Sequence, residues 1–216
     1  NSLNKNFIEY LLSSETIIDQ SIELEKKLNQ DCLNKFDIKD DKLSIIQKNR
    51  ITLHCNSEYL YNEGSREENL IRFRTDYVTD ILSYSIGCMM GRYSLAEEGL
   101  IYANSGNEGF DRSRYGDFPA DGDGIIPVTD VEWFDDDAAS RVVEFISVAW
   151  GPTRLVDNLT FLANNLLPQK NESNRETLRR YLCDGFFKDH LKTYKKRPIY
   201  WLFSSGKQKA FQCLVY

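Results

Sequence analysis

Hydrophobic residues at the start of the chain recur every three or four positions. Between residues 3 and 34 they fall on one side of a helix, opposite charged side chains, which predicts a long amphipathic helix or a pair of helices. A polar break over residues 37–41 interrupts this pattern. Residues 50–55 then alternate briefly, as in a strand or an extended arm, and a turn at residues 62–64 closes the segment.

A second helical pattern begins at Ser65 and continues to about Met90. Ser65 and Glu68 form a capping box, in which each side chain bonds a backbone N–H of the other residue. We therefore expect the central helix of the fold at this position. Three later helices are expected over residues 129–148, opened by a box of Thr129 with Glu132, over residues 153–167, and from a box of Ser173 with Glu176 onward.

The last twenty residues predict a β-hairpin. Residues 199–203 and 210–216 are rich in β-branched and aromatic residues, and residues 204–207 supply a turn. By contrast, residues 95–128 are rich in Gly and Asp and are expected to be irregular. The second hairpin run ends on strand formers and residue 1 is Asn, so we expect a piece of a larger protein.

These patterns together predict an α+β fold. It is expected to be mostly α-helical, with a C-terminal β-hairpin that begins a β-containing recognition region. We divide the chain into an N-terminal amphipathic helical segment with an extended arm, residues 1–64, and a helical connector or recognition-associated domain, residues 65–216.

The composition narrows the class of protein. With 216 residues, 41% of them hydrophobic, the chain can bury a substantial core. It contains no apolar run of about 18 residues and no signal-peptide pattern, so we expect no membrane contact and a cytoplasmic location in a bacterium. Five scattered cysteines and two histidines argue against a disulfide framework and a zinc site. No serine lies in a nucleophile elbow, and we assign no catalytic residue and no metal ligand.

The net charge of −6 conceals an asymmetry along the chain. Residues 65–169 hold 8 Lys or Arg against 18 Asp or Glu, whereas residues 170–216 hold 11 against 4. A locally basic segment can neutralise phosphates. A solvated surface of an intracellular domain would give the same balance.

Basic and aromatic residues alternate around the predicted hairpin. The basic groups could contact a DNA backbone while the aromatic rings stack or wedge at bases. Alternatively, the aromatic residues alternate between core and surface, and the lysines solvate an edge strand. The candidate DNA-binding residues are Lys192, Lys195, Lys196, Arg197, Tyr200, Trp201, Lys207 and Lys209.

Four stretches occur in the order of a known family. They are IGCMMGRYSL at residues 86–95, DGIIPV at residues 123–128, FFKDH at residues 186–190 and KRPIYWLFSSGKQ at residues 196–208. Together they resemble the PglX-type adenine-specific DNA methyltransferases of bacteriophage-exclusion (BREX) systems, which are related to large single-chain restriction-modification enzymes. The resemblance covers residues 65–216, and the first 64 residues match more loosely.

The departures from this family are equally informative. Such enzymes carry a Gly-rich loop for S-adenosylmethionine and an Asn-Pro-Pro-Tyr or Asn-Pro-Pro-Phe motif for the flipped adenine. This chain has no Pro-Pro pair, and its one G-x-G, Gly122 to Gly124, lies in an acidic loop. The resemblance therefore implies a portion C-terminal to the catalytic domain, with no cofactor of its own and with S-adenosylmethionine bound in the parent enzyme.

The resemblance implies a non-catalytic part of a DNA methyltransferase that positions or recognises target DNA. Its expected partners are double-stranded DNA, reached through the parent enzyme, the parent's methyltransferase domain, and other proteins of the defence system. The alternative is a structural connector that joins the methyltransferase and recognition domains without touching DNA, which the acidic middle of the chain favours.

Overall fold

The computed structural model describes residues 2–39, 45–103, 109–206 and 211–216. Its residues form two compact units, one of residues 4–74 and one of residues 1–3 with residues 75–216. The boundary between the units lies inside a helix, whereas the sequence patterns placed a division at residue 64, just before that helix.

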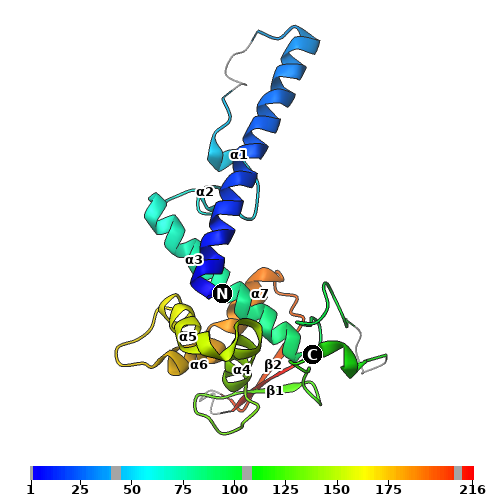
Figure 1. Cartoon of the computed structure of the whole chain (residues 1–216), viewed down its shortest axis with the longest axis vertical. Helices are drawn as coiled ribbons and strands as arrows, with labels where there is room; N and C mark the ends of the chain where they lie inside the picture. The colour runs from blue at the N-terminus through cyan, green and yellow to red at the C-terminus, as the bar shows by residue number, and fades with distance from the viewer. Residues whose placement is uncertain (1, 40–44, 104–108, 207–210) are drawn as a thin grey trace. The chain divides into compact units, whose positions relative to one another are not determined.

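The unit of residues 4–74 is built on α1 (Leu3–Phe36), which Figure 1 shows in dark blue. The short helices η2 (Lys48–Arg50) and α2 (Ser57–Leu60) follow. Asn56 is fully buried between them and donates hydrogen bonds to the carbonyls of Lys48 and Ile51, both at 2.8 Å. The strand or extended arm expected over residues 50–55 is not formed as such. Arg50 ends η2, the Leu53 N–H turns back to the Ile51 carbonyl at 2.9 Å, and residues 51–53 belong to no strand of the described chain.

The predicted central helix is α3 (Arg66–Met89). Its capping box is confirmed, because Ser65 N–H bonds Glu68 Oε2 at 2.8 Å and Glu68 N–H bonds Ser65 Oγ at 3.2 Å. Gly91 lies in the turn just after the helix, and its φ of 75° favours glycine. A Cβ there would lie 2.9 Å from the Phe110 ring and 3.0 Å from the Tyr115 hydroxyl, so this position admits no side chain without rearrangement.

Four helices follow in the second half of the chain. They are α4 (Ala138–Trp150), α5 (Leu155–Asn164), α6 (Asn174–Asp184) and α7 (Phe186–Thr193), with short 3-10 turns η3 (Arg112–Tyr115) and η4 (Pro152–Arg154). The capping box of Ser173 with Glu176 is confirmed at the start of α6.

The predicted helix start at Thr129 is wrong. Helix α4 begins at Ala138, with Asp137 as its N-cap accepting from the Ser140 N–H at 2.8 Å. The Thr129 hydroxyl instead donates to the Val131 carbonyl at 2.6 Å. Asp137 is also ion-paired with Arg179 of α6, and this long-range contact holds residues 129–137 as a loop.

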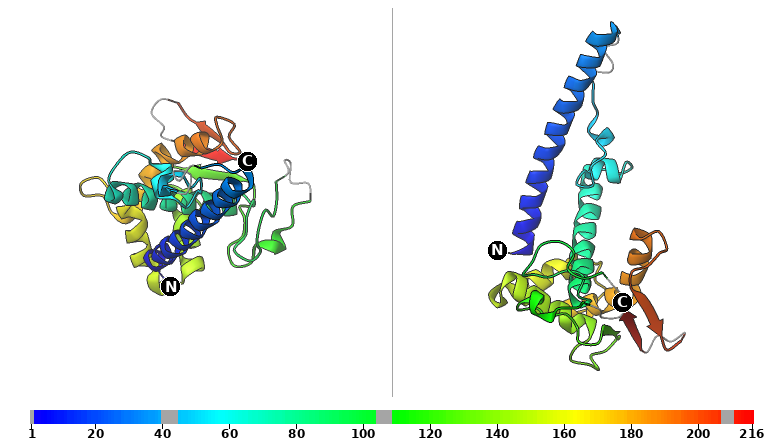
Figure 2. Two further views of the ribbon diagram at one scale, coloured as in Figure 1. Left: turned by 90° about the horizontal axis from the view of Figure 1, so that it is seen from above. Right: turned by 90° about the vertical axis from the view of Figure 1, so that its right-hand side faces the viewer.

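A three-stranded antiparallel sheet completes this unit, in the order β1-β3-β2. The predicted hairpin is confirmed as β2 (Trp201–Ser204) and β3 (Gln212–Val215). Strand β1 (Ile125–Val128), which the sequence patterns missed, pairs with the other side of β3. In Figure 2, α7 in orange lies beside the red hairpin strands. The chain is thus α+β and mostly helical, as predicted.

The core of this unit lies between the helices and one face of the sheet. Ile126, Leu214 and Tyr200 from the sheet region join buried residues of α3 to α7, among them Leu82, Ile86, Val142, Phe145, Leu162, Leu178 and Phe186. Among the helices of the described residues, none has both the length and the hydrophobicity needed to cross a bilayer.

Candidate nucleic-acid interface

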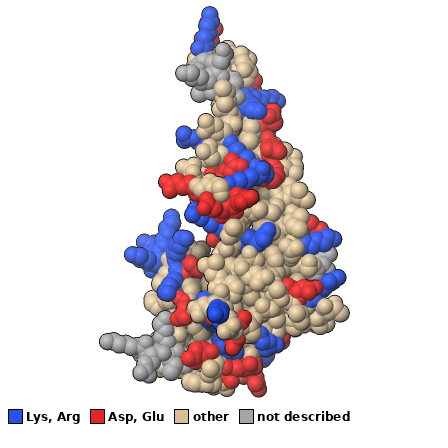
Figure 3. Space-filling model, turned by 90° about the vertical axis from the view of Figure 1, so that its left-hand side faces the viewer, with Lys and Arg blue, Asp and Glu red and all other residues tan. Residues whose placement is uncertain are grey.

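Four cationic side chains gather where α7 gives way to β2. We call residues 192–197 the basic loop, after Lys192, Lys195, Lys196 and Arg197, which are all exposed. Figure 3 shows Lys and Arg side chains gathered at the left margin of the view, on the side of this unit that carries α7. Within the described part of the chain, none of the four forms an ion pair, so their charges face solvent.

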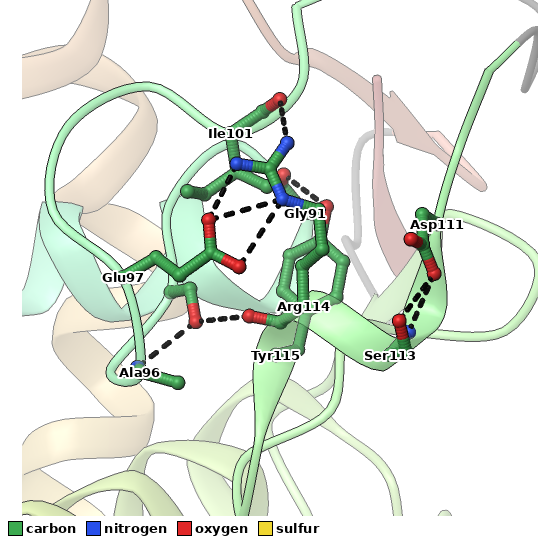
Figure 4. A network of polar contacts seen from close by, with 9 residues as sticks. Gly91, Ala96, Glu97, Ile101, Asp111, Ser113, Arg114 and Tyr115 are labelled. Carbon is green, nitrogen blue, oxygen red and sulfur yellow. Dashed lines mark hydrogen bonds and ion pairs between the residues drawn. The ribbon is translucent and has the colours of Figure 1, made fainter.

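Other arginines of the same unit are occupied within the fold. Arg180 pairs with Glu172 at 2.7 Å, and Arg179 pairs with Asp137. Figure 4 shows Arg114 bound to Glu97, with Nε to Oε2 at 3.0 Å, and its Nη1 directed at the Ile101 carbonyl at 3.4 Å. The contacts of Arg114 fix the irregular segment after α3. The basic loop differs from these arginines in that its four cations are exposed and have no ion pair within the described residues.

The backbone of the basic loop is tightly folded. The Lys196 N–H donates to the Leu191 carbonyl at 2.7 Å, and the Arg197 N–H donates to the Tyr194 carbonyl at 2.9 Å. Lys195 and Lys196 have φ values of 50° and 64°, which non-glycine residues rarely adopt. Such strained conformations occur at functional sites when surrounding contacts enforce them, and here the loop presents three successive cations.

His190 of α7 holds the backbone that follows this loop. Its Nε2 accepts hydrogen bonds from the backbone N–H groups of Ile199 at 3.0 Å and Tyr200 at 3.2 Å. Two N–H donors at one nitrogen require a neutral ring with its proton on Nδ1. The ring lies between aromatic neighbours, with the Tyr200 centroid at 4.9 Å and the Tyr194 centroid at 4.8 Å. Burial, and then the positive charge of Arg92, lowers the pKa of His190 from 6.5 to about 4.

Arg92 links the end of α3 to the last strand. Its Nη1 donates to the Tyr216 hydroxyl at 2.9 Å, and its guanidinium carbon lies 5.6 Å from the Tyr216 ring centroid. The four stretches that resemble the methyltransferase family therefore surround one structural cluster. Residues 86–95 supply Arg92, residues 123–128 supply β1, residues 186–190 supply His190, and residues 196–208 supply Tyr200 and β2.

The structure separates the two aromatic candidates. Tyr200 is only 3% exposed and stacks on His190, so it lies in the core and is left out of the interface. Trp201 is 59% exposed. The remaining two candidates, Lys207 and Lys209, lie outside the described residues.

Sequence reasoning missed two residues of this region. His190 was given no structural role, although its place on α7 among aromatic residues fits a buried helix position. Phe203, also 59% exposed, follows Trp201 by two positions and so shares its face of β2. The alternation of the hairpin sequence could have indicated this pair.

The acidic loop with the G-x-G forms a local turn of its own. The loop at Gly122 to Gly124 leads into β1 rather than a helix, and Asp121 Oδ1 already accepts the N–H groups of Asp123 and Gly124 at 3.0 and 2.8 Å. It therefore does not fit a phosphate-binding or dinucleotide-binding turn. Within the described ranges, no group of three or more His, Cys, Asp or Glu side chains could hold a metal ion.

Comparison with known proteins gives two relatives. The adenine-specific methyltransferase BrxX of Escherichia coli O9:H4 (strain HS) is 45% identical over 223 residues, covering 98% of this chain and 18% of that protein. The adenine-specific methyltransferase PglX of Lacticaseibacillus casei (strain Zhang) is 44% identical over 138 residues, covering 62% of this chain and 11% of that protein. No family model matches the chain. The chain spans less than a fifth of the length of these relatives, and it belongs to the family of the BrxX and PglX adenine-specific methyltransferases.

Proposed function

We propose that this chain is a non-catalytic portion of an S-adenosylmethionine-dependent, adenine-specific DNA methyltransferase of a phage-defence system. In this proposal it positions the enzyme on double-stranded DNA, and the basic loop contacts the phosphates. Methyl transfer and base flipping take place in another part of the enzyme.

One observation carries the proposal. The basic loop presents Lys192, Lys195, Lys196 and Arg197 to solvent without ion-pair partners among the described residues. Its own backbone hydrogen bonds fold it tightly, and His190 holds the two residues, 199 and 200, that follow it closely. Unpaired cations on a rigid loop neutralise phosphates and release counterions on binding. If carboxylates of the fold were paired with these cations, the positive charge would already be neutralised and could not attract phosphates.

Salt dependence of duplex binding tests the proposal. The affinity of the chain for a fluorescent 20-bp duplex is measured by anisotropy between about 50 and 200 mM salt. Three to four phosphate contacts predict a slope of log K against log salt of roughly −3. In the triple variant Lys195→Glu, Lys196→Glu, Arg197→Glu, binding should be lost across this range.

The control is Lys170→Glu, in the exposed turn between α5 and α6, which makes one such charge reversal outside the basic loop and is compared with Lys196→Glu alone as well as with the triple variant. Circular dichroism of each variant checks that the fold is retained. Affinity that does not vary with salt, or a triple variant that binds like the control, contradicts the proposal.

A second role is favoured by a separate observation. Asp130, Glu132, Asp135 and Asp136 are exposed in the loop before α4, and such an acidic surface repels DNA and fits a basic protein partner. In that role the chain connects the methyltransferase and recognition domains without touching DNA. Charge reversal of these four residues would then abolish capture of a separately expressed methyltransferase domain while duplex binding stays absent in every variant.

A further inference from the structure

We propose that the outer face of the three-stranded sheet is a stacking platform for unpaired bases, with Trp201 and Phe203 as its stacking residues. This inference rests on the proposed function, because it assumes that the basic loop holds the phosphates of the same nucleic acid. It adds the base-contacting element and predicts a preference for unpaired over paired bases.

The strand register defines this face. Ile126 and Leu214 stand opposite each other and are each 1% exposed, and Leu202 continues their row toward the core. Side chains one residue along each strand must point the other way. The six residues of the outer face are all uncharged: Ile125, Pro127, Trp201, Phe203, Cys213 and Val215.

Trp201 and Phe203 are the most exposed members of this face, each at 59%. They are two residues apart on one strand, which separates them by about 6.5–7 Å. Successive bases of an extended single strand can therefore meet successive rings. Stacking of a base on an aromatic side chain is independent of base identity, because every base has a π-face.

The platform is rigid before it binds. Its strand β2 is hydrogen-bonded to the central strand β3, and the Ser205 N–H extends this pairing to the Phe211 carbonyl at 2.9 Å. His190 fixes the backbone just before Trp201 through its bond to the Tyr200 N–H. Preorganised aromatic rings lose little conformational entropy on binding.

Charge identifies nucleic acid as the occupant. Lys195, Lys196 and Arg197 come directly before β2 in sequence, so cations flank the start of the aromatic pair. A ligand that carries regularly spaced anions and flat rings satisfies both features. An apolar protein surface would leave the adjacent cations without partners.

The test compares a 15-residue oligodeoxythymidine with a duplex of equal length, using the complete chain. Trp201→Leu and Phe203→Leu should each weaken single-strand binding roughly tenfold, since stacking contributes about this factor per base, and should leave duplex binding within twofold.

Binding of oligodeoxythymidine should quench tryptophan fluorescence. The quenching should persist in Trp133→Phe, which removes another exposed tryptophan that lies in none of the three strands, and disappear in Trp201→Leu.

A second measurement does not depend on the folding of any variant. An oligonucleotide carrying 5-iodouracil is photo-crosslinked to the unaltered chain, and the modified peptide is located by mass spectrometry. We expect the crosslink on the peptide that contains Trp201 and Phe203. A crosslink confined to other peptides overturns the platform.

The outcomes separate the two proposals. In one outcome the chain binds duplex in a salt-dependent way but shows no preference for the single strand, no tryptophan quenching and no crosslink at Trp201 or Phe203. That result contradicts the stacking platform and leaves the proposed function intact. If the unaltered chain binds neither the duplex nor the single strand, both the platform and the proposed function are contradicted. Concentration-dependent self-association that Trp201→Leu abolishes, without any effect on oligonucleotide binding, assigns the face to a protein partner and overturns the platform.

Discussion

Nε2 of His190 accepts a hydrogen bond from the backbone N–H of Ile199 at 3.0 Å. A buried side chain on α7 thus holds the backbone of the residues that lead into β2. The same nitrogen takes the N–H of Tyr200, so the ring can keep both bonds only while it is neutral. The attachment of residues 199 and 200 to α7 is therefore coupled to one protonation state.

The stability of the chain should depend on pH through His190. Its folded pKa of about 4 lies below the ordinary value of 6.5, so the unfolded chain binds the proton more readily. The stabilisation is complete above pH 6.5 and decreases as the pH falls toward 4. Urea unfolding should show a loss of about 2 kcal/mol from this group between pH 7 and pH 5. In His190→Gln this part of the pH dependence should be absent; an equal slope in both proteins would contradict the assignment.

The ion pair of Asp137 with Arg179 should be a large contributor to stability. Asp137 is fully buried, and Arg179 is nearly so, so removing one partner leaves a buried charge unpaired at a cost of about 3 kcal/mol or more. Asp137→Asn keeps a good N-cap for α4, whereas Asp137→Ala loses the cap as well and should cost about 1 kcal/mol more. Thermal unfolding measures both.

The matched control combines Asp137→Asn with Arg179→Met. If the pair is coupled as described, the double variant should be less destabilised than the sum of the two single variants. Additive effects would show that the two side chains act independently.

Gly91→Ala should be strongly destabilising. The residue has a φ of 75°, and a Cβ would lie 2.9 Å from Phe110 and 3.0 Å from the Tyr115 hydroxyl. Backbone strain and overpacking together should lower the free energy of unfolding by about 2–4 kcal/mol. Gly99→Ala is the control, because Gly99 has a similar φ of 83° but no atom within 4 Å of a Cβ. Equal losses at both positions would mean that the packing around Gly91 contributes nothing.

Lys196→Asn should separate binding from folding. Asparagine tolerates the left-handed conformation that Lys196 adopts, so the free energy of unfolding should change by less than about 0.5 kcal/mol. The loss of one cation should reduce the magnitude of the salt slope for duplex binding by about one. Lys170→Asn, which removes a charge elsewhere in the same unit, should leave that slope unchanged.

The elements with strong local signals were predictable from sequence. Helices α1 and α3 have long apolar periods, and the hairpin has two β-rich runs around a turn. The elements that depend on partners distant in the sequence could not be predicted in this way. Residues 129–137 carry a capping pattern, but Arg179 of α6 holds them as a loop. Strand β1 has only four residues and is defined by its pairing with β3, which no local pattern reveals.

The candidate site shows the same division. The cations of the basic loop could be identified from charge alone, because exposed lysines need no partner. Charge and alternation could not show which of Tyr200 and Trp201 is exposed. Alternation assigns the two residues to opposite faces of the strand but does not say which face is buried. Which face is buried depends on the register that places Leu202 beside Leu214 and Ile126.

The position of β3 at the centre of the sheet affects the order of folding. Strand β1 precedes α4, yet its partner strand is made only after α7. During synthesis the helices α4 to α7 can pack through local contacts, while β1 waits with an unpaired edge. We therefore expect the sheet to close last, and a chain interrupted before residue 212 to expose β1 to pairing with other molecules.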